Sequence, residues 1–406
     1  MKGTALFVIF LAVASADIFR YDGYKVYQVI PTNEIHAEVL KVFRENEEYD
    51  FWSKTNILGE SVNIMVKPAL QNSFVKILET NKIEYSILID DAESVFQEER
   101  LRQTRAPKIE KGKISFDKYH RYEDIQAYLE RLQVDYPVKV GTIGKSYEER
   151  ELSYIQIGDN PNNPTIVLDG AIHAREWIAP AMALYLIQQL VENEEYAYLS
   201  ENANWVIIPV LNPDGYEYTH TNNRMWRKTR SRGNTCYGVD ANRNFGYMWG
   251  GLGTSSNECS DIYHGPYAHS EPEVAAFTDF VLGLNNVELY IALHSYGQWV
   301  IYPWGYDFIL PDNVDDIHYL GERIADAIKS VKGTSYTVGN SAILLYPAAG
   351  CSDDWMKGAG GADLSYTLEL PGGGSQGFDL PASRIYDVVI ETFQGILAAY
   401  EYIVEK

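Results

Sequence analysis

Residues 165–177 read TIVLDGAIHAREW and decide how the rest of the chain is interpreted. The short apolar run 165–168 is typical of a buried strand, because the turn residues Asp169 and Gly170 follow it directly. Apolar residues at helical spacing follow over Pro180–Val191. Ligands of open α/β sheets bind beyond the carboxyl ends of the strands, and His173 and Glu176 stand at that place.

The alternation of strand and helix patterns continues to the end of the chain and predicts one α/β domain over residues 106–406. We expect a mixed, mostly parallel central sheet with helices on both faces. Ser270 and Glu273 predict a capping box at the start of one helix. The expected strands are Thr165–Leu168, Trp205–Pro209, Glu288–Leu293 and Leu364–Leu370, and the expected helices are Tyr122–Val134, Pro180–Val191, Glu271–Leu282, Asp316–Val331 and Arg384–Ile403.

The first 105 residues predict two further segments. An apolar run after Lys2 ends in Ala14-Ser15-Ala16, which is typical of a secretory signal peptide over residues 1–16. Residues 17–105 contain a small α+β domain, an antiparallel sheet with helices on one face, followed by a cleavable linker. Its expected strands are 24–30, 61–66 and 85–89, with helices at 33–45 and 69–82.

The segment 98–107 is polar and charged and precedes a proline, so we interpret it as a linker. Arg100, Arg102 and Arg105 would invite cleavage there by a trypsin-like protease. The alternative is a plain charged connector.

Composition excludes several classes of protein. The chain has 406 residues, 46% hydrophobic and 22% charged, which suits two or three globular domains and rules out a disordered chain. The net charge of −22, from 34 basic and 56 acidic side chains, argues against a nucleic-acid partner. Apart from the leader no apolar run is long enough to span a membrane, so we expect a soluble, secreted protein. The three cysteines suggest one disulfide and one free thiol.

His173, Glu176 and His294 are the candidate metal ligands. His294 ends a second buried strand, and two histidines with one glutamate leave the fourth position open, as in catalytic zinc sites. The pair His120 and Glu123 has the same spacing, but it opens a polar stretch and we expect it at the surface. Glu369, on a strand before a proline, is either an edge-strand gatekeeper or a base beside the metal. The arginines at 224, 227 and 243 indicate either that the protein binds an anionic group or that they form ordinary ion pairs at the surface.

Several motifs in order resemble the zinc metallocarboxypeptidases, specifically the secreted digestive-type procarboxypeptidases A and B. They are HAREW at 173–177, NPDG at 212–215, RMWRK at 224–228, DANRNF at 240–245, HSYGQ at 294–298, YPAAG at 346–350 and TLEL at 367–370. The resemblance covers the whole chain. It implies a zymogen whose partners are peptide C-termini, a trypsin-like activating protease and proteinaceous inhibitors.

The resemblance also implies residue roles. His173, Glu176 and His294 would bind one Zn²⁺, Glu369 would be the general base, and Arg227 would polarise the scissile carbonyl. Asn242, Arg243 and Tyr346 would clamp the substrate carboxylate; Arg175, Arg224, Ser295 and Tyr296 would be further substrate-binding residues. The single disulfide would join Cys236 and Cys259.

Substrate preference is expected to depend on Asp353, which the resemblance places at the base of the pocket for the last side chain. An aspartate there is typical of B-type enzymes, which prefer C-terminal Lys or Arg; the alternative is a surface carboxylate beside Asp354. Cys351 and Ser341 stand where glycine is usual, which affects the Lys-versus-Arg preference. Two other functions stay open, an A-type carboxypeptidase for apolar C-termini and an inactive homologue that only binds C-terminal peptides.

Overall fold

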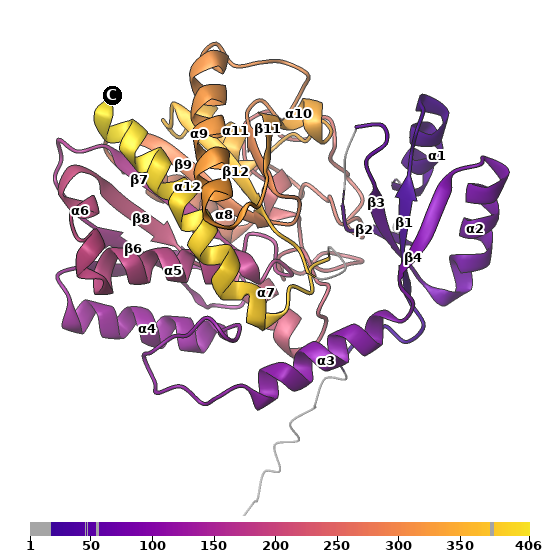
Figure 1. The fold of residues 1–406 in the computed structure, drawn as a ribbon, viewed down its shortest axis with the longest axis horizontal. Coiled ribbons are helices and arrows are strands. Elements are labelled where there is room, and N and C mark those ends of the chain that lie inside the picture. The colour runs from indigo at the N-terminus through magenta and orange to yellow at the C-terminus, as the bar shows by residue number, and fades with distance from the viewer. Residues whose placement is uncertain (1–17, 45, 47, 54–56, 374–376) are drawn as a thin grey trace, which may run out of the picture.

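The computed structural model describes residues 18–44, 46, 48–53, 57–373 and 377–406 (Figure 1). The expected signal peptide lies outside these residues. None of the helices in this described part combines the length and apolarity that a membrane crossing requires.

A small N-terminal domain contains a four-stranded antiparallel sheet, in the order β2-β3-β1-β4. Figure 1 shows helices α1 and α2 on the face that points away from the rest of the molecule. Successive side chains of a strand point to opposite faces, so Tyr27 and Val29 pack under the helices, whereas Val26 packs toward the second domain. The elements are β1 (Lys25–Ile30), α1 (Glu34–Arg44), β2 (Tyr49–Phe51), β3 (Val62–Val66), α2 (Gln71–Thr80) and β4 (Glu84–Ile89).

The expected linker is instead the end of a helix, α3 (Ala92–Arg105), which runs from the small domain to the large one (Figure 1). Its buried residues lie in its first half, and Phe96 packs in the interface between the domains. Arg102 pairs with Glu98 one turn earlier, which favours a helix in this polar segment. The helix ends before Ala106, because a residue followed by proline disfavours the helical conformation.

The large domain is an α/β domain, as predicted. Its eight strands lie in the order β11-β10-β12-β9-β7-β8-β6-β5. The central strands β12, β9, β7 and β8 run parallel, and antiparallel pairs join β10, β6 and β5 to them. The strands are β5 (Lys139–Lys145), β6 (Glu151–Ile157), β7 (Thr165–Gly170), β8 (Asn204–Ile208), β9 (Val287–Ser295), β10 (Trp299–Tyr302), β11 (Thr337–Asn340) and β12 (Leu364–Leu370).

Helices cover both faces of this sheet. One apolar core lies under α4 (Tyr122–Asp135), α5 (Ile178–Glu192), α9 (Val314–Lys332) and α12 (Ile385–Glu405), and a second lies under α8 (Pro272–Val281) and α11 (Ser352–Gly358). The five expected helices are confirmed to within two residues at each end. Shorter helices are α6 (Leu199–Asn202), α7 (Pro213–Thr221) and α10 (Ser341–Leu344).

The expected capping box is wrong. Helix α8 begins at Pro272, so Glu271 and not Ser270 is the residue that precedes it. Glu273 accepts a hydrogen bond from the backbone N–H of Tyr147, 3.0 Å away, and therefore anchors a distant turn instead of the helix start.

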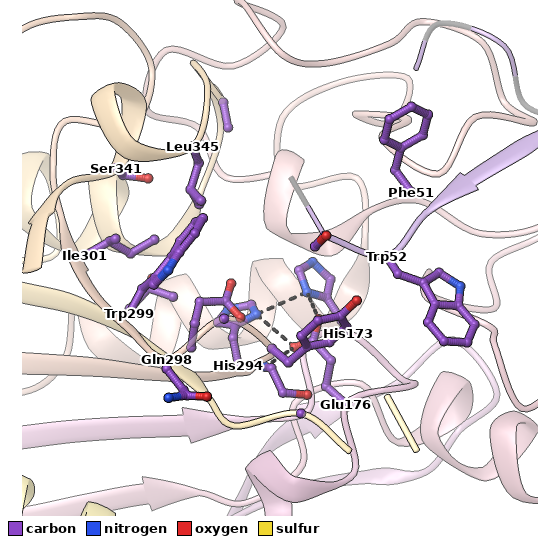
Figure 2. A pocket seen from close by; sticks show the side chains of 18 of the residues that line it. Phe51, Trp52, His173, Glu176, His294, Gln298, Trp299, Ile301, Ser341 and Leu345 are labelled. Atoms are coloured by element: carbon purple, nitrogen blue, oxygen red, sulfur yellow. Dashed lines mark hydrogen bonds and ion pairs between the residues drawn. The ribbon is translucent and has the colours of Figure 1, made fainter. Parts of the chain in front are cut away.

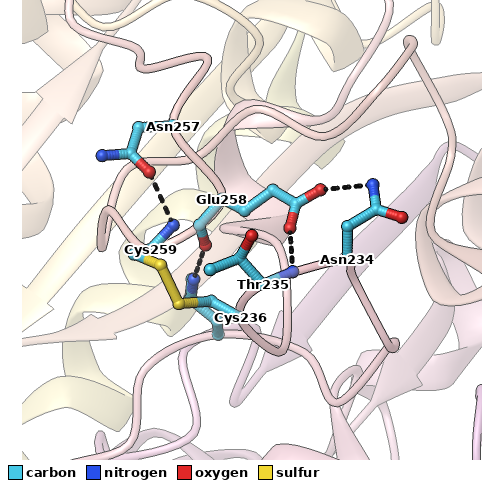
Figure 3. Close-up of a disulfide and its surroundings, with 7 residues drawn as sticks. Asn234, Thr235, Cys236, Asn257, Glu258 and Cys259 are labelled. Carbon is cyan, nitrogen blue, oxygen red and sulfur yellow. Dashed lines mark hydrogen bonds between the residues drawn. A yellow bond between two sulfur atoms is a disulfide. The ribbon is translucent and has the colours of Figure 1, made fainter.

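The disulfide between Cys236 and Cys259 is confirmed (Figure 3). It closes a loop in which the carboxylate of Glu258 accepts hydrogen bonds from the backbone of Thr235 and the side chain of Asn234. Inside that loop lie Asn242 and Arg243, which line the site described next, and the backbone N–H of Asn242 donates to Asp240 Oδ1 at 3.1 Å. Cys351 is free and buried.

Candidate active site

His173, Glu176 and His294 converge at the carboxyl ends of β7 and β9 (Figure 2). His173 follows β7, Glu176 lies three residues later before α5, and His294 is the penultimate residue of β9. One ligand atom of each lies within 4.8 Å of the others. His173 Nδ1 is 2.9 Å from Glu176 Oε1, and His294 Nδ1 is 3.0 Å from Glu176 Oε2. The three predicted ligands therefore form one buried cluster.

The surroundings of this cluster suit a metal ion. Burial by itself would raise the pKa of Glu176, but the two imidazoles lower it below its ordinary value. The other ring nitrogen of His173 is 3.1 Å from Asp240 Oδ1, and such a carboxylate orients a metal-binding histidine. Two imidazoles and a carboxylate are the donor set of catalytic zinc, so the residues fit the ion.

Arg227 lies beside the cluster. Its guanidinium donates to Asp240 Oδ2 through Nε at 3.2 Å and Nη2 at 2.9 Å, and Nη1 is 4.0 Å from Glu176 Oε1. Asp240 thus touches both a metal ligand and Arg227, and these contacts hold the pKa of its carboxyl well below the usual range despite its burial. Asp240 opens the motif DANRNF, but no role was predicted for it from the sequence.

Glu369 belongs to an interior strand. β12 lies between β10 and β9, so the interpretation of Glu369 as an edge-strand gatekeeper is wrong. Glu369 is the register partner of His294 on the parallel strand β9, and residues in register share a face of the sheet. The apolar residues of β12 pack into the core on the opposite face. Glu369 lines the same cavity as the three ligands.

A cavity of about 400 Å³ extends from the three ligands. Figure 2 shows Trp299, Ile301, Ser341 and Leu345 on one side of it. The predicted carboxylate clamp also lines the cavity: Asn242, Arg243 and Tyr346, with Arg243 Nη2 donating to the Tyr346 hydroxyl at 2.9 Å. Ser295 lines it as well, and its backbone N–H donates to Glu176 Oε2 at 3.2 Å.

Asp353 lines this cavity and is only 3% exposed, so the alternative of a surface carboxylate is wrong. Burial raises the pKa of its carboxyl. The adjacent Asp354 accepts hydrogen bonds from the backbone of Gly305 and Tyr306 and does not line the cavity. Cys351 lines the cavity and its Sγ lies 3.3 Å from Arg243 Nη1, so it fills space beside the clamp that a glycine would leave open.

The pair His120 and Glu123 is not part of the site. The expected surface position is confirmed for Glu123, which is exposed, but wrong for His120, which is 5% exposed. The ring Nε2 of His120 accepts from the backbone N–H of Ser115 at 3.0 Å. The spacing of a histidine and a glutamate three residues apart therefore does not by itself predict a metal site. The pair His173 and Glu176 differs because it follows the end of a buried strand.

Comparisons with known proteins agree with this geometry. Residues 125–395 match the zinc carboxypeptidase family, and residues 27–99 match the carboxypeptidase activation peptide. The chain belongs to the zinc carboxypeptidase family. It is a metallocarboxypeptidase zymogen, and His173, Glu176 and His294 are its zinc site.

Relatives of both specificity types are similar to the zymogen. It is 38% identical to carboxypeptidase B of Helicoverpa zea, over 95% of each chain. It is 36% identical to zinc carboxypeptidase A 1 of Anopheles gambiae, over 98% of this chain and 93% of that protein. The solved structure of carboxypeptidase A from Helicoverpa armigera matches with a TM-score of 0.90 at 33% identity, over 95% of this chain and 98% of that one.

The activation domain of the zymogen lies over the cavity. Phe51 and Trp52 line the cavity on the side opposite Trp299 and Ile301 (Figure 2). Arg175 Nη1 donates to both carboxylate oxygens of Asp50, at 3.0 and 3.1 Å. Arg224 donates to Glu99 of α3.

Aromatic contacts extend this interface. The ring of Trp52 packs edge-on against Phe378 of the catalytic domain, and Asn63 donates to the hydroxyl of Tyr296 at 3.2 Å. The guanidinium of Arg44 lies 5.3 Å from the ring centre of Tyr346. In the zymogen the expected substrate-binding residues Arg175, Arg224 and Tyr296 thus contact the activation domain. Asp50 was not predicted as a partner of Arg175, because nothing in its local sequence distinguishes it from other acidic residues.

Proposed function

We propose that the protein is a secreted zymogen of a B-type carboxypeptidase, which removes C-terminal Lys or Arg from peptides. The observation that carries this proposal is the buried Asp353 in the cavity wall. A buried carboxylate without a cation is costly, so a substrate side chain that neutralises it gains affinity over an apolar one. The names of the relatives, of both A and B types, leave this choice open.

We assign the chemical steps to residues around the zinc site. Zinc, when bound, polarises a carbonyl group and acidifies a water molecule. Glu369 takes the proton from the attacking water and passes it to the leaving amine, a role supported by its register with His294. Arg227 stabilises the negative charge that develops on the carbonyl oxygen, and Asp240 holds its guanidinium in place.

Selection of chain ends is assigned to Arg243, with Asn242 and Tyr346. The guanidinium of Arg243 is held by the backbone carbonyls of Asn242 and Gly253 and by the Tyr346 hydroxyl. A fixed guanidinium of this kind pairs with a carboxylate, and only the end of a peptide offers one. Internal peptide bonds are rejected because they leave this charge unpaired.

Activation is proposed to follow cleavage after Arg105. Arg100 and Arg102 form ion pairs with Glu93 and Glu98 inside α3, whereas Arg105 is the exposed last residue of the helix. A trypsin-like protease needs an extended substrate, and the chain leaves the helix at Ala106. Secretion and recognition by proteinaceous inhibitors stay predictions.

The test compares substrates that end in Lys and in Phe. In the activated enzyme, Asp353→Ala is expected to lower kcat/KM for the Lys substrate by roughly 10²-fold or more, because one partner of a buried charge pair is lost. The Phe substrate is expected to be unaffected or improved, and zinc content is expected to stay the same.

Asp363→Ala is the matched control, because this carboxylate is 56% exposed and pairs with Lys357 at the other end of α11. An equal loss on both substrates in Asp353→Ala would contradict the B-type assignment. Zinc-loaded wild type that binds C-terminal peptides without hydrolysing them would favour the inactive homologue.

A further inference from the structure

Asp169 Oδ1 and His294 Nε2 are among the buried polar atoms near the zinc site that have no hydrogen-bond partner in the described residues. Asp169 is 0% exposed and His294 is 1% exposed. An unsatisfied buried polar group costs about 1–3 kcal/mol, more if it is charged, so two in one place call for an explanation.

The two atoms are chemically complementary. His294 Nδ1 faces Glu176 and His173 in the ligand cluster, at 3.0 and 3.1 Å. A neutral imidazole that binds a metal through Nδ1 carries its proton on Nε2, so Nε2 is a donor. Asp169 Oδ1 is an acceptor.

The strand register brings the donor and the acceptor to the same place. Asp169 on β7 is the register partner of Ala292 on the parallel strand β9. Residues two apart along a strand share a face, so Tyr290 and His294 flank Ala292 on the face that carries Asp169. The hydroxyl of Tyr290 donates to Asp169 Oδ2. Oδ1 is left for the other diagonal neighbour, which is His294.

We propose that Asp169 is a positioning residue of the zinc site. Its Oδ1 accepts a hydrogen bond from the Nε2–H group of His294, directly or through one ordered water molecule. Asp169 then does for His294 what Asp240 does for His173. Tyr290 holds the second carboxylate oxygen and so fixes the orientation of the acceptor. The inference rests on the zinc site, because His294 needs this support only as a ligand.

The test measures zinc affinity in the activated enzyme by competition with a chelator at fixed pH. Asp169→Asn keeps the shape of the side chain and removes its charge, and we expect a 10- to 100-fold weaker affinity for zinc, the usual effect of losing such a partner. Tyr290→Phe is the matched control: it removes the other hydrogen bond of Asp169 and is expected to weaken zinc binding much less. Wild-type zinc affinity in Asp169→Asn would overturn the proposal.

A second measurement serves if Asp169→Asn does not fold. In zinc-loaded wild type labelled with ¹⁵N-histidine, the His294 Nε2–H signal is expected to exchange slowly with solvent and to shift in Tyr290→Phe. Rapid exchange of that proton would overturn the proposal. A wild-type chain that binds no zinc would instead contradict the zinc site itself, so the two failures are distinguishable.

Discussion

The ion pair between Asp50 and Arg175 is expected to keep the zymogen inactive, and Asp50→Ala tests this. The Arg175 side chain is 3% exposed and that of Asp50 is 20% exposed. Removing one partner of a buried pair costs about 3–5 kcal/mol, and the partial exposure of Asp50 reduces this to about 2–3 kcal/mol. The loss falls on the docked state only, because both side chains are hydrated when the domains separate. Each 1.4 kcal/mol is a factor of ten, so the undocked population should rise roughly 30- to 140-fold.

The assay measures the hydrolysis rate of a small C-terminal lysine substrate by the uncut chain, as a fraction of the rate after activation. The uncut wild-type and Asp50→Ala proteins both carry Arg105→Gln, which prevents cleavage at that residue, and mass spectrometry confirms that they are intact. The activated proteins used as the reference keep Arg105 so that they can be cleaved. The uncut fraction is expected to rise roughly 30- to 140-fold in Asp50→Ala, up to the limit set by full activity. The rate after activation should not change, because the activation domain is then gone.

Asp90→Ala is the control for this experiment. Asp90 forms an ion pair with Lys25 at 2.6 Å in the same domain, but its side chain is 80% exposed and the pair lies outside the interface, so no change is expected. An uncut rate for Asp50→Ala equal to that of the control would refute the reasoning. Inhibition would then depend on the apolar contacts of Trp52.

Three further outcomes follow from the structure. Glu369→Gln should retain zinc and lose at least about 10²-fold in kcat, whereas His294→Ala should lose the metal; metal analysis beside single-turnover kinetics distinguishes the two roles. Arg105→Gln should prevent full activation by trypsin. A normal yield of active enzyme, with the same N-terminus as active wild type, would assign the cleavage to another residue. Burial raises the pKa of Glu273 from 4.5 to about 8, so the folded state binds this proton more tightly than the unfolded state does, and its contribution to stability is complete below pH 4.5 and lost as the pH rises to about 8. Glu273→Gln should flatten the fall of the urea midpoint across that range, and an unchanged slope would exclude Glu273 as its source.

Periodicity predicted the elements that build the centre of the molecule. β7, β9 and β12 are buried on both faces, so each appears in the sequence as a compact apolar run, and α5 and α12 have apolar residues at helical spacing. The edge strand β5 was missed because it is half exposed and carries two glycines, and β10 because it has only four residues. α3 was missed because its polar surface faces solvent and its few apolar residues meet another domain.

By itself the sequence determined the chemistry that the chain carries: His173 with Glu176 at a strand end, a second histidine at the end of another strand, and cysteines for one disulfide. These signals are local, because side-chain type and strand or helix spacing are set within a few residues. Only the tertiary structure decided which groups meet. It brings His294 to His173 across 121 residues, places Glu369 in an interior strand and sets Asp50 of another domain against Arg175. Such contacts depend on strand order and domain docking, which many distant apolar contacts determine together and which leave no pattern near any one of these residues.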